Sequence, residues 1–537
     1  MQTKGGWPSV ADVLRDRAQH QSDTPFVRCG DGEWLTYLDV ETRSDRIAAG
    51  LARLGVSKGD RVAMISTNRP ETVDVIFACA KLGAIEVALS AWLKGEFLRY
   101  QLEDSGAEVI ATDDEGLASI KALGALSHVR SIVTLDSDIE SVPGANVPFV
   151  DLATAGDPLP SVTCAPTDLM AILYTSGTTG SPKGCMLSHR YFMTVGSAYR
   201  ERWGLTANDR IFTALPLFHA GGQLICLMTA LMSGMSVAFE ESFSASRYIP
   251  RAIEADATVL IGTGSMAMAI IAQPADPTEH ANRIRIAHYA PVPPDKRREF
   301  EKRFDTRLIN EGYGQTECAP VSVGTPGSPR DDGAAVPLPF LDVRIADMNG
   351  NEVPAGEVGE ILVRAKEPGG IYSGYWTGAG ASTQETGWHH TGDNGTVDSE
   401  GNLRFVDRLK DSLRRRGENV SSIELESALL QIDGMRQAAA TGVPSPLGED
   451  DIKVTLVYDG PPPEPTALFE IFAARIPYYA VPRYVEFRES LPTTVTGRVQ
   501  KHLLRDEGIT PTTWDFEALG LNLAKDQRRQ VKPQASS

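Results

Sequence analysis

The chain has 537 residues, 42% of them hydrophobic and 23% charged, which excludes a mostly disordered or fibrous protein and predicts two or more domains. The 52 Lys and Arg residues against 70 Asp and Glu residues give a net charge of −18, which argues against nonspecific nucleic-acid binding. The six cysteines are scattered, the N-terminus has no apolar signal core, and the apolar stretch from Leu224 to Met232 is too short to span a bilayer. We therefore expect a cytoplasmic protein without a membrane span.

The N-terminal part alternates apolar strands with helices that have one apolar face. Arg61 to Ser66 is expected to form a buried strand, Glu71 to Leu82 a helix that Gly83 ends, and Glu108 to Thr112 the next strand. The same alternation returns at 168–200, 210–240 and 257–271. It predicts an α/β fold with parallel sheets covered by helices.

From about residue 340 the expected strands become short and are separated by turn residues. They are Leu341 to Ile345, Gly359 to Arg364, Gly395 to Val397 and Leu403 to Val406, and they predict a small barrel-like section. A basic stretch at 408–416 follows, and then a helix at 423–431, a strand at 453–458 and a helix at 466–475. This order predicts a small α+β domain of ordinary size. We place an N-terminal domain at 1–408, a hinge at 409–412, a mobile C-terminal domain at 413–515 and a polar tail at 516–537.

The segment from Tyr174 to Gly184 is rich in glycine and hydroxyl side chains and contains Lys183. It follows the expected strand from Leu169 to Tyr174 directly. Small residues let backbone N–H groups approach an anion, hydroxyls add donors, and the lysine adds charge, so the segment suits a triphosphate. The spacing differs from the Walker A pattern, because Gly184 follows the lysine.

Four further motifs follow this segment in the chain. They are Asn310-Glu-Gly-Tyr-Gly-Gln-Thr-Glu317, Gly387-Trp-His-His-Thr-Gly-Asp393, Asp407-Arg-Leu-Lys-Asp-Ser412 and the stretch from Arg416 to Glu426. With the first segment they resemble, in order, the motifs of the adenylate-forming (AMP-binding) superfamily, which includes acyl-CoA synthetases, luciferases of the firefly type and adenylation domains of peptide synthetases. The stretch from Arg416 resembles the carnitine/crotonobetaine-CoA ligase branch. Five ordered motifs are far more specific than one.

The resemblance implies the positions of the nucleotide and the metal. Tyr313 would stack on adenine, Asp393 would accept the ribose hydroxyls, and Thr175 and Glu317 would hold Mg²⁺ with the phosphates of ATP. The other residues implied to bind the nucleotide are Ser176, Gly177, Thr178, Thr179, Gly180, Lys183, Glu311, Gly312, Gly314, Gln315, Thr316 and Arg408. Lys183, Thr316 and Glu317 are also implied in catalysis.

The resemblance implies an acyl pocket and a mobile C-terminal domain as well. His219 would flank the acyl pocket and gate it, although a satisfied core histidine is the alternative. Gly262, Met266, His288, Tyr289 and Ala290 would line the pocket, with a buried helix start as the alternative for the methionine. Residues implied at the hinge and beside CoA are Lys410, Arg416, Gly417 and Glu418.

Two departures from the family pattern concern the first half-reaction and the pocket. Arg498 stands where the family has a lysine that reaches the substrate carboxylate and the α-phosphate, and Lys501 matches the second basic position. Arg keeps the charge but is longer, planar and forked. Tyr289 adds bulk where the family has a glycine beside the pocket.

The sequence as a whole predicts an AMP-forming ligase that joins a small, apolar carboxylic acid to CoA at the expense of ATP, with Mg²⁺ as cofactor. Several alternatives stay open: a carrier protein as acyl acceptor, a variant that performs thioester formation alone, a non-catalytic nucleotide-binding relative, and luciferase-type oxidation. The sequence fixes neither the acid nor the oligomeric state.

Overall fold

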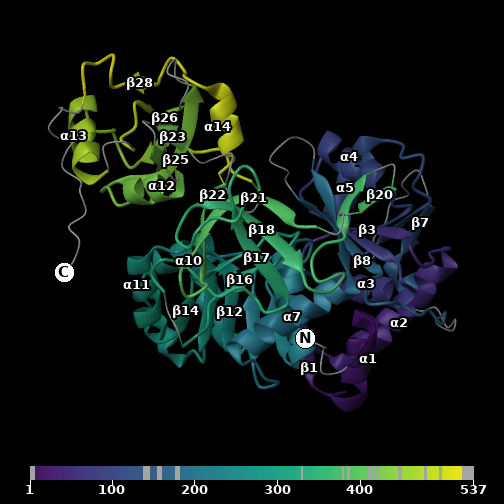
Figure 1. Ribbon diagram of the computed structural model, residues 1–537. Coiled ribbons are helices and arrows are strands. Elements are labelled where there is room, and N and C mark those ends of the chain that lie inside the picture. The colour runs from purple at the N-terminus through teal and green to yellow at the C-terminus, as the bar shows by residue number, and fades with distance from the viewer. Residues whose placement is uncertain are drawn as a thin grey trace. The chain divides into compact units, whose positions relative to one another are not determined.

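The computed structural model describes residues 6–136, 145–153, 160–175, 182–327, 330–377, 380–383, 387–408, 413–415, 418–420, 422–444, 450–476, 480–494 and 499–522 (Figure 1). The chain forms two compact units. The first comprises Met1–Arg344, Leu362–His389 and Val397–Arg404. The second comprises Ile345–Ile361, His390–Thr396 and Phe405–Ser537. The division of the chain therefore passes through the strands that follow residue 340.

A nine-stranded sheet forms one half of the first unit. Its order is β20 (Gly380–Thr383), β19 (Gly374–Thr377), β9 (Lys183–Ser188), β8 (Leu169–Thr175), β4 (Ile85–Leu89), β3 (Arg61–Ile65), β5 (Val109–Thr112), β6 (Ser131–Thr134), β7 (Ala145–Pro148). From β8 to β7 the neighbouring strands are parallel, whereas β9, β19 and β20 join the other edge as antiparallel strands. The expected strands at 61–66 and 108–112 and the helix at 71–82 are thus confirmed, the last as α3 (Pro70–Leu82), which ends at left-handed Gly83.

Helices cover both faces of this sheet because its strands carry apolar side chains on both sides. On β3, Val62 and Met64 pack against α2 (Tyr37–Arg53) and α3. The alternating residues Ala63 and Ile65 pack with α4 (Gly95–Ser105) and α5 (Asp114–Leu123). Such near-continuous apolar strands are typical of parallel sheets buried on both faces. The fold class predicted from the sequence is therefore present.

A seven-stranded sheet forms the other half of the first unit. Its order is β14 (Arg307–Ile309), β13 (Ile286–Ala290), β12 (Val259–Thr263), β10 (Arg210–Thr213), β11 (Ser236–Phe239), β1 (Pro25–Cys29), β2 (Leu35–Thr36), all parallel except the β1–β2 pair. One face packs against α9 (Ala245–Glu254), α10 (Gly264–Ile271) and α11 (Pro294–Phe304). Other elements of the unit are α1 (Val10–His20), α6 (Phe149–Ala153), α7 (His189–Trp203), the π-helix η1 (Gly221–Leu227), α8 (Met228–Ser233), the 3-10 helix η2 (Pro277–Ala281), and the short strands β15 (Gly312–Tyr313) and β16 (Ser322–Val323).

The short strands predicted after residue 340 are present. They are β17 (Leu341–Ala346), β18 (Gly359–Ala365), β21 (His389–Val397) and β22 (Leu403–Arg408). The third begins six residues earlier than expected, so it includes most of the motif that ends at Asp393. That motif therefore lies on a strand and not in an open turn.

The C-terminal part of the second unit is an α+β domain with its own core. Its sheet has the order β25 (Met435–Pro444), β26 (Asp450–Tyr458), β27 (Tyr484–Phe487), β28 (Trp514–Asp515), and its helices are α12 (Ser422–Leu430), α13 (Pro465–Arg475) and α14 (Lys501–Glu507). A short hairpin, β23 (Leu413–Arg415) with β24 (Glu418–Val420), precedes them. Apolar side chains of α12, α13 and the sheet form one cluster, and Leu504 of α14 packs in a smaller one with Ala439, Val457 and Leu491. The expected helices at 423–431 and 466–475 and the strand at 453–458 are thus found.

Two global features bear on the cellular setting that the sequence predicts. In the described ranges, no helix combines the length and the apolar character that crossing a membrane requires. All six cysteines lie among the described residues, where they are buried and form no disulfide. Burial raises the pKa of thiols such as Cys79 and Cys226, so these cysteines are protonated packing residues and not nucleophiles.

Candidate active site

The two ends of the glycine-rich segment meet on the nine-stranded sheet. Thr175 ends β8 and Lys183 begins β9, and the two residues are register partners in this antiparallel pair. The Thr175 hydroxyl donates to the Lys183 carbonyl oxygen at 3.4 Å, and Lys183 is exposed. Just before the loop, the Tyr174 hydroxyl donates to Asp104 Oδ2 of α4 at 2.6 Å and fixes the strand end. The intervening Ser176, Gly177, Thr178, Thr179 and Gly180 lie outside the described residues.

Tyr375 brings Lys183 and Glu317 together, although they come from distant segments. Tyr375 lies on β19 opposite Cys185 of β9, and Cys185 follows Lys183 by two residues on the same strand. Its hydroxyl donates to Glu317 Oε1 at 2.8 Å. The Lys183 ammonium lies over its ring, 5.0 Å from the centroid. Tyr375 has no local sequence signal, because its place in the site depends on the antiparallel pairing of β19 with β9.

Buried groups next to Glu317 stay uncharged. Burial and the negative charge of Glu317 raise the pKa of the Tyr375 hydroxyl above its usual value. The same two causes raise the pKa of the Cys185 thiol. A protonated hydroxyl can donate to the carboxylate, so Tyr375 and Cys185 add no negative charge of their own beside Glu317.

The backbone around Glu317 is held from two sides. The Tyr372 N–H donates to the Glu317 carbonyl oxygen at 2.9 Å, and the Tyr191 hydroxyl donates to the Thr316 carbonyl oxygen at 3.1 Å. The Tyr372 hydroxyl also lies 3.3 Å from Nδ1 of His389, whose Nε2 lies 3.4 Å from Gln315 Oε1. A chain of side chains thus runs from β21 to the segment that contains Gln315, Thr316 and Glu317.

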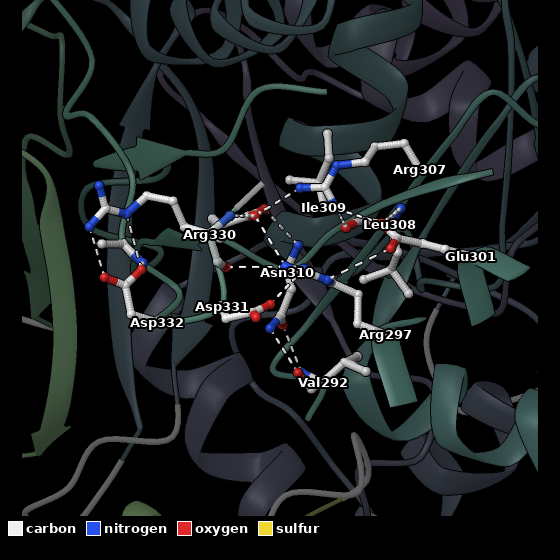
Figure 2. A network of polar contacts seen from close by, with 12 residues as sticks. Val292, Arg297, Glu301, Arg307, Leu308, Ile309, Asn310, Arg330, Asp331 and Asp332 are labelled. Atoms are coloured by element: carbon white, nitrogen blue, oxygen red, sulfur yellow. Dashed lines mark hydrogen bonds and ion pairs between the residues drawn. The ribbon is translucent and has the colours of Figure 1, made fainter. Parts of the chain in front are cut away.

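The carboxylate of Glu311 is buried and has structural partners. Its Oε1 accepts from Arg307 Nη2 at 2.8 Å and from the Arg330 backbone N–H at 2.7 Å, while Oε2 accepts from the Asn310 N–H at 3.0 Å. Figure 2 shows these arginines converging beside Asn310, whose amide is paired with the backbone of Val292 at 2.7 Å in both directions. The side chain of Glu311 therefore shapes the loop, and its contact with a nucleotide stays a prediction.

Close backbone approach explains the glycines beside Tyr313. Gly312 and Tyr313 form β15, which pairs with β16. Gly312 has φ +149, and a Cβ there would meet the Ser322 carbonyl oxygen at 2.9 Å. A Cβ on Gly314 would lie 3.2 Å from Ala319 Cα. Tyr313 itself is half-buried, and its stacking on adenine stays a prediction.

Asp393 lies on β21 in the second unit, directly after left-handed Gly392. Only 5% of it is exposed. The strand segment before it is fixed by Glu360, which accepts from the Gly392 N–H at 3.1 Å and pairs with His390 Nδ1 at 2.8 Å. A fixed, buried carboxylate is suited to two vicinal hydroxyls. Glu360 has no signal in the sequence, because it lies on a different strand.

The acyl-pocket candidates lie at the carboxyl ends of parallel strands. β12 pairs with β13, so that Ile261, Gly262 and Thr263 stand opposite His288, Tyr289 and Ala290. His288 and Ala290 are half-buried, as is Gly262. In open α/β sheets, ligands bind outside the carboxyl ends of the strands. His288 donates from Nδ1 to the Ile309 carbonyl oxygen at 3.1 Å, and burial lowers its pKa to about 4, so it is neutral.

Tyr289 points to the other face of the strand and belongs to the core. It is fully buried, and its ring centroid lies 5.6 Å from that of Phe300 on α11. A Cβ on Gly262 would meet Tyr289 Cε1 at 2.5 Å and Met266 Cε at 3.0 Å. Met266 is buried on α10, as the helix alternative expected. The Tyr289 ring thus occupies the space that a side chain at position 262 would need. It packs on the core side of the sheet and does not project from the face that carries His288 and Ala290.

His219 is presented by a tightly clamped turn. It is exposed, so the alternative of a satisfied core histidine is wrong. The His219 N–H donates to the Pro216 carbonyl oxygen at 3.1 Å, and its own carbonyl oxygen accepts from the Gln223 N–H at 3.0 Å. Behind the turn, Asn68 Oδ1 accepts from the Leu217 N–H at 2.7 Å. Gln223 Nε2 of the π-helix η1 donates to buried Glu86 Oε1 of β4 at 3.0 Å. π-Helical turns are frequently found at functional sites.

In the C-terminal domain, Lys501 is engaged by its own unit. Its Nζ lies 2.8 Å from Glu426 Oε1 and donates to Ser422 Oγ at 2.5 Å. Ser422 in turn donates from its N–H and its hydroxyl to Asp407 Oδ2, both at 2.7 Å. Arg408 ends β22, and Glu418 begins β24. Lys410, Arg416, Gly417 and Arg498 lie outside the described residues, and their roles stay predictions.

The donor set fits Mg²⁺ that is bound together with a substrate. Across the described ranges, no group of three or more His, Cys, Asp or Glu side chains could hold a metal ion. Mg²⁺ is usually bound through one or two carboxylates plus substrate phosphates. Glu317, held by Tyr375 and lying beside Lys183 at the phosphate segment, matches this requirement.

Comparison with known proteins agrees with this geometry. The profile of the AMP-binding enzyme family matches residues 14–376, and that of the AMP-binding enzyme C-terminal domain matches residues 424–498. The chain therefore belongs to the AMP-binding enzyme family.

Three relatives illustrate the similarity. The chain is 34% identical to a feruloyl-CoA synthase from Amycolatopsis sp and 28% identical to a crotonobetaine/carnitine–CoA ligase from Salmonella paratyphi A, and each match covers 93% of this chain and 98% of the relative. The crystal structure of the anthranilate CoA ligase AuaEII in complex with anthranoyl-AMP matches with a TM-score of 0.83 and 25% identity, over 93% of this chain and 97% of that one.

Proposed function

We propose that this AMP-forming acyl-CoA ligase activates an apolar, aromatic carboxylic acid with ATP and transfers the acyl group to CoA. The observation that carries the proposal is the meeting of Lys183 and Glu317 at Tyr375, which assembles a cation and a metal-binding carboxylate at the phosphate segment. The candidate acyl face supports an apolar acid, because neutral His288 and Ala290 offer no charged partner for a polar substrate. Relatives that are named for feruloyl-CoA and anthranoyl-AMP support an aromatic one.

In the first half-reaction, a carboxylate oxygen of the acid attacks the α-phosphorus of ATP. The new bond joins this oxygen to phosphorus, the bond between the α- and β-phosphates breaks, and pyrophosphate leaves. Lys183 neutralises and orients the phosphoryl oxygens, as positioned cations do in phosphoryl transfer, and Thr175 stands opposite it on the neighbouring strand. Thr175 and Glu317 would hold Mg²⁺ together with the phosphates, and the ion would supply further charge neutralisation. Asp393 holds the ribose in this scheme.

In the second half-reaction, a thiol attacks the carbonyl carbon of the acyl-adenylate, and AMP leaves. We place the pivot of the C-terminal domain at residues 409–412 and the thiol passage beside Gly417, where a side chain would obstruct the acceptor. CoA is the acceptor that the relatives' names favour, and a carrier protein is the alternative. The protein works in the cytoplasm in this scheme, with its buried free thiols reduced.

The experiment is a matched panel of acids with ATP and Mg²⁺, with and without CoA, read by mass spectrometry. Ferulate and anthranilate represent aromatic acids, decanoate a linear apolar acid, and crotonobetaine a charged one. We expect acyl-adenylate and acyl-CoA with the aromatic acids and little product with crotonobetaine. Turnover that is fastest with crotonobetaine would reject the substrate class, and acyl transfer to a carrier protein but not to CoA would reject the acceptor.

A further inference from the structure

We propose that Tyr375 is a positioning residue that sets the metal-binding orientation of Glu317 and the phosphate-binding orientation of Lys183. The inference rests on the proposed function of these two groups. Its hydroxyl donates to Glu317 Oε1 at 2.8 Å, and its ring faces the Lys183 ammonium, 5.0 Å from the centroid. One side chain therefore contacts the acidic and the basic group of the phosphate site at once.

The hydroxyl orients the carboxylate without using up its capacity to bind a cation. A carboxylate has about four lone-pair sites on its two oxygens, and a single hydrogen bond occupies one of them. Partners behind metal-binding side chains fix their orientation, and their loss typically lowers metal affinity about 10–100-fold where the ligands are all from protein. Since the substrate phosphates also bind Mg²⁺, the loss of this one hydrogen bond should have a smaller effect here.

The ring holds Lys183 in a way that keeps the ammonium available to phosphate. An ammonium over an aromatic face is attracted by the quadrupole of the ring, at about 0.5–1 kcal/mol where the site is exposed. A carboxylate in the same place would compete directly with the phosphate for the three N–H donors. Among the described residues, the ring of Tyr375 contacts the Lys183 ammonium, and no carboxylate forms an ion pair with this ammonium.

The surroundings of Tyr375 make its orientation rigid before any ligand binds. The pairing of Tyr375 with Cys185 and of Trp376 with Gly184 fixes the strand on β9. The Trp376 indole donates to the Asp104 carbonyl oxygen at 2.8 Å. The ring of Tyr372 packs edge-on against that of Tyr375, with the centroids 5.1 Å apart. A positioning role requires such a fixed scaffold, since a mobile ring would orient neither Glu317 nor Lys183.

The test separates the hydroxyl from the ring. Tyr375→Phe keeps the ring beneath Lys183 and removes the hydrogen bond to Glu317, whereas Tyr375→Leu removes both contacts. Tyr37→Phe is the matched control, because it also removes a buried tyrosine hydroxyl of the same unit, one that donates to the carbonyl oxygens of Met235 and Ala230. Mn²⁺ binding to the enzyme with a non-hydrolysable ATP analogue is measured by electron paramagnetic resonance. Binding of the analogue alone is measured by calorimetry in the presence of a chelator.

We expect Tyr375→Phe to weaken Mn²⁺ binding about three- to tenfold while leaving metal-free analogue binding unchanged. Tyr375→Leu should weaken both, and the control should weaken neither. Unchanged Mn²⁺ affinity in a folded Tyr375→Phe protein would overturn the inference, whether or not the leucine variant folds. These binding measurements need no turnover. A wild-type protein that releases no pyrophosphate with any acid would reject the proposed function, and the Mn²⁺ affinity of Tyr375→Phe would still test the role of Tyr375.

Discussion

The ammonium of Lys501 lies 2.8 Å from the Glu426 carboxylate, inside the C-terminal domain. Burial raises the pKa of Glu426, and its Oε1 also accepts from the Ala440 N–H at 2.6 Å. Lys501 is thus a structural cation of its own unit, and this makes Arg498 the better candidate for the basic group of the adenylation step.

The first prediction concerns this ion pair. Lys501→Ala leaves Glu426 and Ser422 without their cation, so we expect a loss of about 1–3 kcal/mol in the free energy of unfolding of the C-terminal domain. Glu426→Gln should cost less, since an amide tolerates burial, and the double variant should cost less than the sum of the two. Urea unfolding followed by domain-specific probes measures this. Full stability in Lys501→Ala would show that the pair contributes nothing.

The second prediction concerns the buried carboxyl of Glu86, which anchors the π-helix beside His219. Burial raises its pKa from 4.5 to about 8. The folded protein therefore keeps a proton that the unfolded chain loses, and stability should fall as pH rises between about 5 and 8. Glu86→Gln removes this titration and should flatten that part of the profile, a difference of up to about 4 kcal/mol across the window. Thermal unfolding at a series of pH values tests it, and parallel profiles for the two proteins would contradict it.

The third prediction concerns the ribose. Asp393→Ala should weaken AMP binding by about 1–3 kcal/mol, because two hydroxyls lose their acceptor. Asp347→Ala is the control, since Asp347 is a turn carboxylate that accepts from its own loop. Calorimetry on both folded variants decides the matter. An AMP affinity of Asp393→Ala equal to that of Asp347→Ala would show that Asp393 does not bind the nucleotide.

The fourth prediction concerns Arg498. Arg498→Ala should lower pyrophosphate release while leaving the conversion of synthetic acyl-adenylate to thioester nearly unchanged, because we expect the domain rotation to carry this motif away for the second step. Arg498→Lys should raise the first step or leave it alone, since a charge misplaced by about 1 Å can cost on the order of a hundredfold. A wild type that forms no acyl-adenylate yet converts supplied adenylate would establish the thioester-forming alternative.

Much of the fold follows from local sequence patterns, and much of the site does not. Alternation of apolar strands and helices predicts β3, α3 and β5, and turn residues predict β17, β18, β21 and β22. Tyr375 and Glu360 escape prediction because each acts through strand pairing across the sheet. The motif predicts Tyr289 beside the pocket, but strand alternation turns its ring into the core. Register of this kind depends on tertiary structure, which a motif does not encode.

The central claim is that the acid attacks the α-phosphorus of ATP. It is tested by incubating the enzyme with ATP, Mg²⁺, CoA and ferulate labelled with ¹⁸O in its carboxylate. Bond formation between the carboxylate oxygen and the α-phosphorus followed by thiol attack on the carbonyl carbon leaves one labelled oxygen on AMP. We predict that mass spectrometry finds one ¹⁸O in each AMP and none in pyrophosphate. Label in inorganic phosphate with formation of ADP, or unlabelled AMP alongside acyl-CoA, would contradict the account.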